Sequence, residues 1–335
     1  MFLRITTLLA LSVASLLAAE NNLKWTALPD LPGGLGVAGP FVGVHNDALI
    51  IGGGANFPDG VPWRPTAGGG VSAKVYHDTI HVVTRDGYSI AEAKAKLPRT
   101  LGYGISVPTA DGVLCIGGEW REGGVTHRSA KVFALGQADG QVVIDENYPA
   151  LPKGTTAAAG ALVGETVYVA GGDSGDGATK NFWALDLAKR GAADFGWVTL
   201  PPWDGPARTH LLASAQHDGA TDCLYIFSGR MKDGDGHWRM LGDAHKFNPK
   251  SGEWKKIHDI LPSGDGQPRC VMAGTVAPIG ANQLLVFGGA NGKRFITLTG
   301  LAEQIAAAEA AGNTAAAATP KAEQQKIART APGHP

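Results

Sequence analysis

The sequence is poor in cysteine. It contains three cysteines, Cys115, Cys223 and Cys270, and none of them belongs to a Cys-x-x-Cys pair. This number and spacing exclude a dense disulfide framework and the usual cysteine-based zinc site. Each cysteine lies in or beside an apolar, strand-like run, so we expect buried packing residues and no metal. One disulfide among them is compatible with an oxidising compartment.

The chain also lacks net charge and internal membrane-length segments. Its formal net charge is −1 and 44% of its 335 residues are hydrophobic, a globular composition with no general attraction to nucleic acid. The one long apolar run, residues 1–19, combines Arg4, an apolar core too short for a bilayer and two terminal alanines. We therefore predict a signal peptide over 1–19 and a periplasmic or secreted protein, without a membrane partner after cleavage. A membrane anchor is the alternative.

Glycine, in contrast, is abundant, and it recurs in a pattern. Five apolar runs end in small residues, mostly a glycine pair: ALIIGGGAN (48–56), VLCIGGEW (113–120), VYVAGGDS (167–174), LYIFSGR (224–230) and LLVFGGAN (284–291). A strand-like stretch and a tight turn precede each run, and two further strand-like runs follow the first four. Four antiparallel strands per unit predict an all-β fold, a kelch-type β-propeller with about five recognisable blades. A β-sandwich would not repeat the glycine pair five times.

Strand parity decides which loops share a face of such a propeller. Strands a, b, c and d of each unit alternate in direction, so the b–c and d–a loops lie on one face and the other loops on the opposite face. The glycine pair ends strand b, which places the segment GGANFPDGVPWRP (53–65) on the first face. Its three prolines favour a pre-set loop shape, so its polar and aromatic side chains need little ordering to bind a ligand.

The same parity separates the charges. The first face collects cations, whereas turns on the opposite face collect Asp47, Asp111, Glu165, Asp218 and Asp222. Because an arginine fork can hold a carboxylate, we expect a small anionic ligand at the mouth of the central funnel. The general polarity of long loops is the alternative explanation. The candidate substrate-binding residues are Asn56, Trp63, Arg64, Arg99, Arg208, Arg230, Arg269 and Asn291.

The C-terminal segment differs from the repeats. The stretch LAEQIAAAEAAG (301–312) has helical spacing of apolar residues and is expected to form a helix. The rest of this segment is rich in Ala, Lys, Glu and Pro, and we expect it to be disordered. The predicted organisation is a signal peptide over 1–19, a propeller over 20–295 and a helical or disordered Ala-rich tail over 296–335.

Four stretches together resemble a known family: GGANFPDGVPW (53–63), KVYHDTIHVV (74–83), LGYGISVPTADGVLCIGGEW (101–120) and HKFNPKSGEWKKI (245–257). They are similar to the cyclically permuted mutarotases, kelch-repeat relatives of bacterial N-acetylneuraminate epimerase. The resemblance runs from about Lys24 to Asn291. It implies a six-bladed propeller that interconverts the α and β anomers of sialic acid without a metal or organic cofactor. Ring opening needs a base for the anomeric hydroxyl and an acid for the ring oxygen, which a paired carboxylate and cation can supply.

The chain departs from the family pattern after strand b of unit five. The family's proposed catalytic Glu and Arg lie in a sixth blade, whose last strand should be KWTALPDLP (24–32) and whose other strands we do not find. The segment GGEWREGGVTHR (117–128) has a similar composition in another blade, so Glu119 is a paralogous catalytic candidate and not a matched residue. Catalysis is therefore expected of complete relatives, and Glu119 is the candidate in this chain.

An incomplete propeller exposes unpaired sheet edges, through which a chain can oligomerise. Three explanations are open: a shortened gene product, a chain completed by a partner, and closure with five blades. The first is favoured, and closure with five blades is favoured least, because removing one blade of six changes every angle between blades.

Two other functions suit a kelch propeller. One is non-catalytic binding of glycans or proteins on the cationic face. The other is an oxidase of the galactose oxidase type, which needs copper held by Tyr and His and a Cys cross-linked to Tyr. The three cysteines lie in strand-like segments without such an arrangement. Acceleration of anomer exchange separates the mutarotase from the binding protein.

Overall fold

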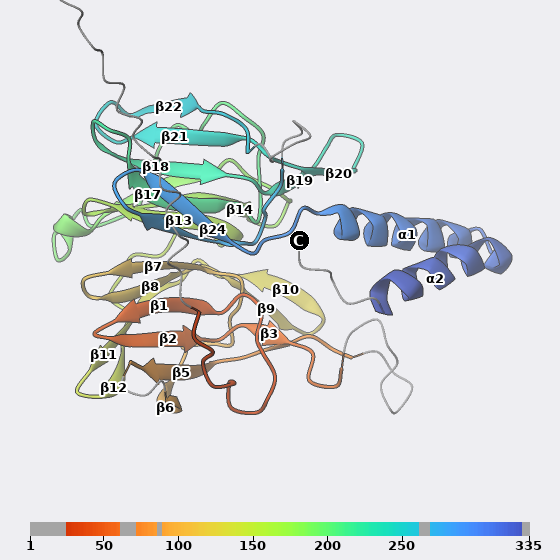
Figure 1. Cartoon of the computed structure of the whole chain (residues 1–335), viewed down its shortest axis with the longest axis horizontal. Helices are drawn as coiled ribbons and strands as arrows, with labels where there is room; N and C mark the ends of the chain where they lie inside the picture. Colours follow the sequence, from red (N-terminus) through yellow and green to blue (C-terminus); the bar gives the residue numbers. More distant parts are fainter. Residues whose placement is uncertain (1–24, 61–71, 86–88, 261–268, 330–335) are drawn as a thin grey trace, which may run out of the picture.

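The computed structural model describes residues 25–60, 72–85, 89–260 and 269–329 (Figure 1). Its strands form four antiparallel sheets of four strands and a further sheet of two strands, which we number as blades 1 to 5 along the chain. Three short two-stranded ribbons accompany them. The predicted signal peptide and two predicted site residues, Trp63 and Arg64, lie outside the described residues.

Each blade is built from consecutive segments. Blade 1 contains β1 (Phe41–His45), β2 (Ala48–Gly52), β5 (Thr79–Thr84) and β6 (Ile90–Lys96). Blade 2 contains β7 (Ile105–Thr109), β8 (Gly112–Ile116), β11 (Val132–Ala138) and β12 (Gln141–Asp145). Blade 3 contains β13 (Thr156–Val163), β14 (Thr166–Asp173), β15 (Phe182–Asp186) and β16 (Val198–Thr199). Blade 4 contains β17 (Leu212–His217), β18 (Asp222–Phe227), β21 (Ala244–Asn248) and β22 (Glu253–Lys256), and blade 5 contains β23 (Thr275–Ile279) and β24 (Gln283–Phe287).

Neighbouring blades pack face to face through apolar side chains. The first strands contact one another in chain order: β1 with β7, β7 with β13, β13 with β17, and β17 with β23. Among the described residues, no comparable packing joins β23 or β24 to β1. Large buried residues fill the spaces between blades, among them Phe41 and Phe133 between blades 1 and 2, and Phe182 and Phe247 between blades 3 and 4. The three cysteines are buried and free, as expected of packing residues, and no disulfide joins them.

The glycine pair links each blade to the next. Its backbone has positive φ angles, for example 69° at Gly171 and 90° at Gly172, which L side chains rarely adopt. The second glycine also donates its N–H to a carbonyl of the following blade: Gly54 to Leu101 at 2.7 Å and Gly118 to Thr155 at 2.8 Å. A Cβ on the first glycine would collide with the backbone of the following blade, 2.4 Å from the Leu101 oxygen at Gly53 and 2.6 Å from the Thr155 oxygen at Gly117. The pair is therefore required by the close approach of two backbones.

A chain of backbone hydrogen bonds runs around the funnel through the d–a turns. The N–H of each turn residue donates to the carbonyl of its counterpart in the preceding blade, at 2.7 to 3.0 Å, along the series Gly39, Tyr103, Ala157, His210 and Ala273. All five residues have φ between 52° and 60°, although only one of them is glycine. This uncommon conformation turns the neighbouring side chains toward the funnel mouth.

Three b–c segments expected as loops are β-ribbons. They pair β3 (Ala55–Asn56) with β4 (Val75–Tyr76), β9 (Glu119–Glu122) with β10 (Val125–Arg128), and β19 (Arg230–Lys232) with β20 (Trp238–Met240). Their short strands follow the glycine pair directly, and their polar sequences gave no alternating apolar signal. The ribbons hold the site residues on paired backbone.

The segment after blade 5 corrects the predicted tail. Helix α1 (Lys293–Ala310) begins before the predicted helix, and α2 (Thr314–Arg329), which was expected to be disordered, folds back against it (Figure 1). Ala, Glu, Gln and Lys favour helices, and an ion pair between Lys321 and Glu309 at 2.6 Å joins the two helices. None of the described helices has the length and apolarity to cross a membrane.

The N-terminal segment also differs from expectation. The described part of KWTALPDLP forms no strand. Instead, the ring of Trp25 packs edge-on against Phe287 of β24, at 5.8 Å between ring centroids. The described residues after β24 contain no strand of a sixth blade with which this segment could pair.

The glycine crossing can be tested in blade 3. A Cβ on Gly171 would lie 2.7 Å from the carbonyl oxygen of Arg208, which leads into blade 4, whereas nothing lies within 4 Å of a Cβ on Gly164, whose φ is also positive. We expect Gly171→Ala to lower the free energy of unfolding by about 3–4 kcal/mol and Gly164→Ala by about 1–2 kcal/mol. Urea unfolding measures both, and equal losses would contradict the crossing argument.

Candidate functional site

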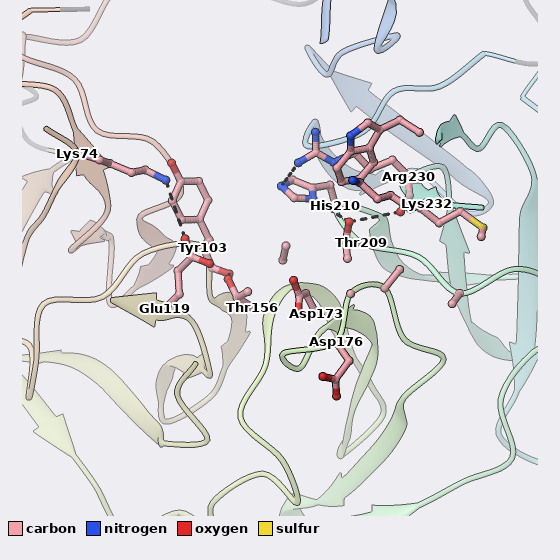
Figure 2. A pocket seen from close by; sticks show the side chains of 16 residues that line it. Lys74, Tyr103, Glu119, Thr156, Asp173, Asp176, Thr209, His210, Arg230 and Lys232 are labelled. Carbon is pink, nitrogen blue, oxygen red and sulfur yellow. Dashed lines mark hydrogen bonds and ion pairs between the residues drawn. The ribbon is translucent and has the colours of Figure 1, made fainter. Parts of the chain in front are cut away.

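A cavity of about 640 Å³ lies where the b–c and d–a segments of blades 1 to 4 meet (Figure 2). Strand parity predicted that these segments share a face, and their meeting in one cavity confirms it. The residues after the glycine pairs and the residues of the d–a turns both line it. The lining residues include Lys74, Tyr103, Glu119, Thr156, Asp173, Asp176, Thr209, His210, Arg230, Lys232 and Trp238.

One wall presents a carboxylate next to an ammonium group. Glu119 begins β9, and its Oε1 accepts a hydrogen bond of 2.5 Å from the hydroxyl of Tyr76. The Nζ of Lys74 lies 3.9 Å from the same oxygen and 4.1 Å from the ring centroid of Tyr103. Burial, and next the hydrogen bond to Glu119, raise the pKa of Tyr76. The hydroxyl therefore stays protonated and holds the carboxylate in place. We call these four residues the Glu119 wall.

The facing wall presents a guanidinium group. Arg230 begins β19, and its Nη2 lies 3.4 Å from Nε2 of His210. Its guanidinium carbon lies 4.8 Å from the Trp238 ring centroid, and Lys232 Nζ lies 5.2 Å from the same centroid. Burial and then the Arg230 charge lower the pKa of His210 to about 4. At neutral pH His210 is therefore uncharged, and its Nε2 can accept a hydrogen bond from Arg230. We call these four residues the Arg230 wall.

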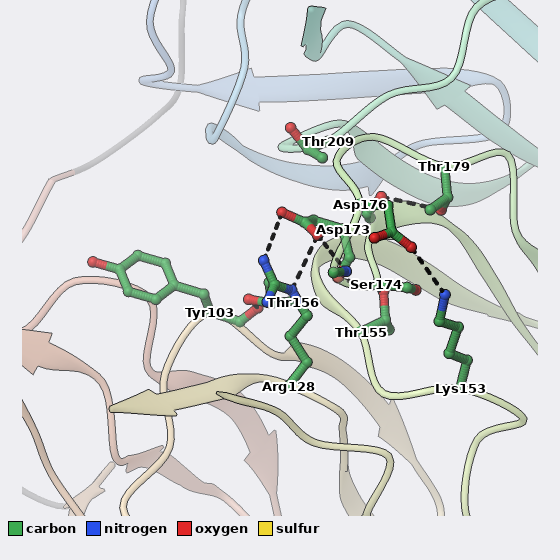
Figure 3. Close-up of polar contacts among 12 residues, drawn as sticks. Tyr103, Arg128, Lys153, Thr155, Thr156, Asp173, Ser174, Asp176, Thr179 and Thr209 are labelled. Carbon is green, nitrogen blue, oxygen red and sulfur yellow. Dashed lines mark hydrogen bonds and ion pairs between the residues drawn. The ribbon is translucent and has the colours of Figure 1, made fainter. Parts of the chain in front are cut away.

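The floor between the walls carries two further carboxylates, each with its own cation (Figure 3). Arg128 donates to Asp173 at 3.0 Å, and Lys153 Nζ lies 3.7 Å from Asp176. The guanidinium of Arg128 thus neutralises the charge of Asp173. The floor is therefore close to neutral.

The charge balance of the cavity refines the expected cationic face. Three cations, Lys74, Arg230 and Lys232, line it together with three carboxylates. Each carboxylate has a cationic partner, whereas no ion pair among the described residues includes Arg230 or Lys232. The positive excess is thus confined to the Arg230 wall. On the opposite face, Asp47, Asp111 and Asp218 pair with Arg85, Arg190 and Lys246, so that face is less acidic than the sequence implied.

Arg208 does not line the cavity. Its side chain is fully buried, and its Nη2 donates to Asp243 at 2.6 Å while Nη1 donates to the carbonyl of Ser228. His245 also contacts Asp243, at 2.8 Å. The guanidinium of Arg208 therefore joins the segments that contain Ser228 and Asp243 in blade 4, and it is not turned toward a ligand. The sequence correctly predicted that Arg208 lies between strands d and a, but it did not indicate the pairing with Asp243.

The other predicted binding residues are dispersed. Asn56 contacts His77 and lines a separate cavity of about 230 Å³ in blade 1. Arg99 lies 4.1 Å from the ring centroid of Trp120, outside the main cavity. Asn291 accepts a hydrogen bond from the N–H of Lys293 at the start of α1. Arg269 is exposed and does not line the cavity.

Glu119 and Arg230 are therefore the two predicted site residues that the cavity brings together. Sequence reasoning missed Lys74, Tyr103 and Trp238. Tyr103 could have been predicted from its position, because it lies in a d–a turn equivalent to the turn that contains His210. Trp238 was not predicted because the segment after Lys232 was expected to be a loop, whereas it forms the ribbon in which Trp238 pairs with Lys232.

One group of described residues has the proximity needed for a metal ion. Asp233, Asp235 and His237 lie in the turn between β19 and β20. Asp233 accepts hydrogen bonds from two backbone N–H groups of this turn and from Arg239 Nε at 2.7 Å. These hydrogen bonds within the turn explain why the three side chains lie close together.

Comparison with known families gives a consistent result. The model of the N-acetylneuraminate epimerase family matches residues 148–323, which is more than half of the chain. N-acetylneuraminate epimerases of Haemophilus influenzae (strain PittEE) and Yersinia enterocolitica are 32% and 36% identical over 146 and 117 residues. These alignments cover 44% and 32% of this chain and 34% and 29% of the relatives. The chain thus spans about a third of the length of the curated relatives it matches.

A solved structure shares the fold. YjhT superimposes with a TM-score of 0.61 over 79% of this chain and 80% of that chain, at 17% sequence identity. This likeness confirms the kelch-type β-propeller predicted from the glycine repeat.

The buried pair of Arg208 and Asp243 predicts a pH-dependent stability. Burial would raise the pKa of Asp243, but the hydrogen bonds from His245 and Arg208 outweigh it and hold the pKa well below the usual range. The pair therefore stabilises the fold above about pH 4, and this contribution is lost as the pH falls toward the folded-state pKa. We expect Asp243→Asn to cost about 3–5 kcal/mol at pH 7.

The difference in unfolding free energy between wild type and Asp243→Asn should shrink below pH 4, since Asp243 then takes up a proton in the unfolded wild type while the folded state still holds the charge. Urea unfolding between pH 3 and pH 7 measures it. Asp235→Asn, at an exposed turn, is the matched control. A difference that stays constant with pH would contradict the proposed ion pair.

Proposed function

Since the chain belongs to the N-acetylneuraminate epimerase family, we propose that it interconverts the α and β anomers of N-acetylneuraminate or of a closely related sugar acid. The observation that carries this proposal is the arrangement of the cavity. A guanidinium without a carboxylate partner among the described residues faces a carboxylate paired with an ammonium group. The first arrangement suits binding of a sugar acid and the second suits proton transfer.

Arg230 is the proposed anchor for the substrate carboxylate. A guanidinium can donate two parallel hydrogen bonds to a carboxylate, and its strength increases in a partly buried site. Lys232 adds positive charge, whereas neutral His210 adds none. The carboxylate of N-acetylneuraminate is attached to the anomeric carbon, so anchoring it also positions the reacting centre.

Glu119 is the proposed base, and Lys74 the proposed acid. Glu119 takes the proton of the anomeric hydroxyl as the bond from the anomeric carbon to the ring oxygen breaks. The electron pair of that bond passes to the ring oxygen, which takes a proton from Lys74. Rotation about the adjacent carbon–carbon bond then presents the other carbonyl face. Ring closure returns both protons, so the two residues end in their initial states.

The hydroxyl of Tyr76 supports this role of Glu119. Its hydrogen bond fixes one carboxylate oxygen, and its raised pKa keeps it a donor through the reaction. Thr156 and Thr209 line the cavity and offer hydroxyl groups to the remaining sugar hydroxyls. We also propose that the reaction takes place in the periplasm or outside the cell, as the N-terminal 19 residues suggest.

Anomer exchange provides the test of Glu119. We expect the folded protein to accelerate α-to-β conversion of freshly dissolved α-N-acetylneuraminate, followed by proton NMR. Glu119→Gln should lower the acceleration by about 100-fold, because the amide cannot accept the proton. Glu122→Gln, an exposed change in the same strand, is the control and should leave the rate unchanged.

A rate for Glu119→Gln equal to the wild-type rate would contradict the role of Glu119. Folded protein that binds the sugar without accelerating exchange would instead support the alternative of a non-catalytic glycan-binding propeller.

Substitution of Arg230 tests the anchor separately. Arg230→Met should raise the substrate concentration for half-maximal rate at least about 10-fold, since a charged hydrogen-bond pair is lost. Arg239→Met is the matched control, because Arg239 lies on the neighbouring strand and pairs with Asp233 at 2.7 Å. An unchanged half-maximal concentration for Arg230→Met would place the carboxylate elsewhere.

A further inference from the structure

The first turn of α1 contacts the Arg230 wall. Phe295, the third residue of α1, lies with its ring centroid 4.1 Å from the guanidinium carbon of Arg230. The same ring packs edge-on against Trp238, at 5.0 Å between centroids and an interplanar angle of 78°. Arg230 is therefore in contact with two aromatic rings, one from the β19–β20 ribbon and one from the helix.

The alternation of the ribbon explains this contact. Arg230 pairs with Met240 and Lys232 pairs with Trp238, so these four side chains share one ribbon face. The start of α1 covers that face, and a Cβ on Gly292 would collide with the Met240 side chain. Gly292 has φ 78° and precedes the helix as its N-cap, which allows the close approach. No residue of α1 is fully buried, and beyond its first turn the helix extends from the blades (Figure 1).

We propose that Phe295 and Trp238 are positioning residues that clamp the Arg230 guanidinium, so that its edge is presented to the substrate carboxylate. The proposal rests on the proposed function and deepens it: the helical segment after blade 5 forms part of the substrate-binding site. Each aromatic ring attracts the cation through its face without using an N–H donor. Apart from the donor directed at His210, the guanidinium donors are thus left for a planar anion, and little side-chain entropy is lost on binding.

The partial burial of Arg230 supports the clamp. Burial lowers the pKa of its guanidinium, and its Nε is buried without a hydrogen-bond partner among the described residues. Aromatic faces compensate a cation in such a place less completely than a carboxylate would. A carboxylate ligand is therefore expected to bind more tightly to Arg230 than to an exposed, already paired arginine such as Arg239.

Ligand discrimination tests the clamp. Calorimetry should show that the wild type binds N-acetylneuraminate at least 10-fold more tightly than its uncharged methyl ester. Phe295→Ala should weaken binding of the acid about 10-fold and leave the ester unchanged. Phe295→Tyr keeps the aromatic face and should restore the preference. Ile296→Ala is the control, since this neighbouring side chain is 41% exposed.

Equal weakening of acid and ester by Phe295→Ala, or no weakening of either, overturns the proposal. A second readout does not depend on ligand or activity. The Nε–H proton of Arg230, identified by its loss in Arg230→Lys, should move downfield in Phe295→Ala, because the ring current of Phe295 is removed. An unmoved resonance overturns the clamp. If wild type binds neither compound, the proposed function fails, and this resonance alone decides whether the clamp exists.

Discussion

The architecture depends on the close approach of two backbones where strand b of each blade meets the d–a turn of the next. In blades 1 to 3 the second glycine of the pair donates to a carbonyl of the following blade, and Gly172 does so to Arg208 at 2.9 Å. Only residues without a side chain fit at the pair, because a Cβ on the first glycine would touch the backbone of the following blade and a Cβ on the second would touch atoms of its own blade. The crossing fixes the position of the residue that follows it, which is Glu119 in blade 2, Asp173 in blade 3 and Arg230 in blade 4. The site is therefore a consequence of how the blades are joined.

The side chains at these equivalent positions carry charges that are neutralised by different kinds of partner. Asp173 is held by Arg128 and Glu119 by Lys74, whereas Arg230 is held by aromatic rings and neutral His210. Fold repetition supplies the positions, and side-chain partners from ribbons and helix determine which of them is available to a ligand. In the proposed function, an anion binds at one wall and protons are transferred at the other.

The glycine repeat was sufficient to predict the blades and the face on which the site lies, because both follow from strand period and direction. Pairing partners were not predictable in the same way. Arg208 and Arg230 look alike in sequence, yet one is buried against Asp243 and the other lines the cavity. That difference arises from contacts across 20 to 35 residues of chain, which no local pattern encodes. Helix α2 was missed for a related reason, since packing against α1 stabilises a polar, Ala-rich segment that composition alone marks as disordered.

Exchange spectroscopy at anomeric equilibrium tests the central claim most directly. In a mixture of the two N-acetylneuraminate anomers, the α and β resonances should exchange faster with catalytic amounts of folded protein, in proportion to its concentration. A saturating amount of a non-mutarotating carboxylate glycoside of the same sugar should suppress this exchange by occupying Arg230. An exchange rate equal to that in buffer, from protein that demonstrably binds the glycoside, would contradict the account and leave a binding protein in its place.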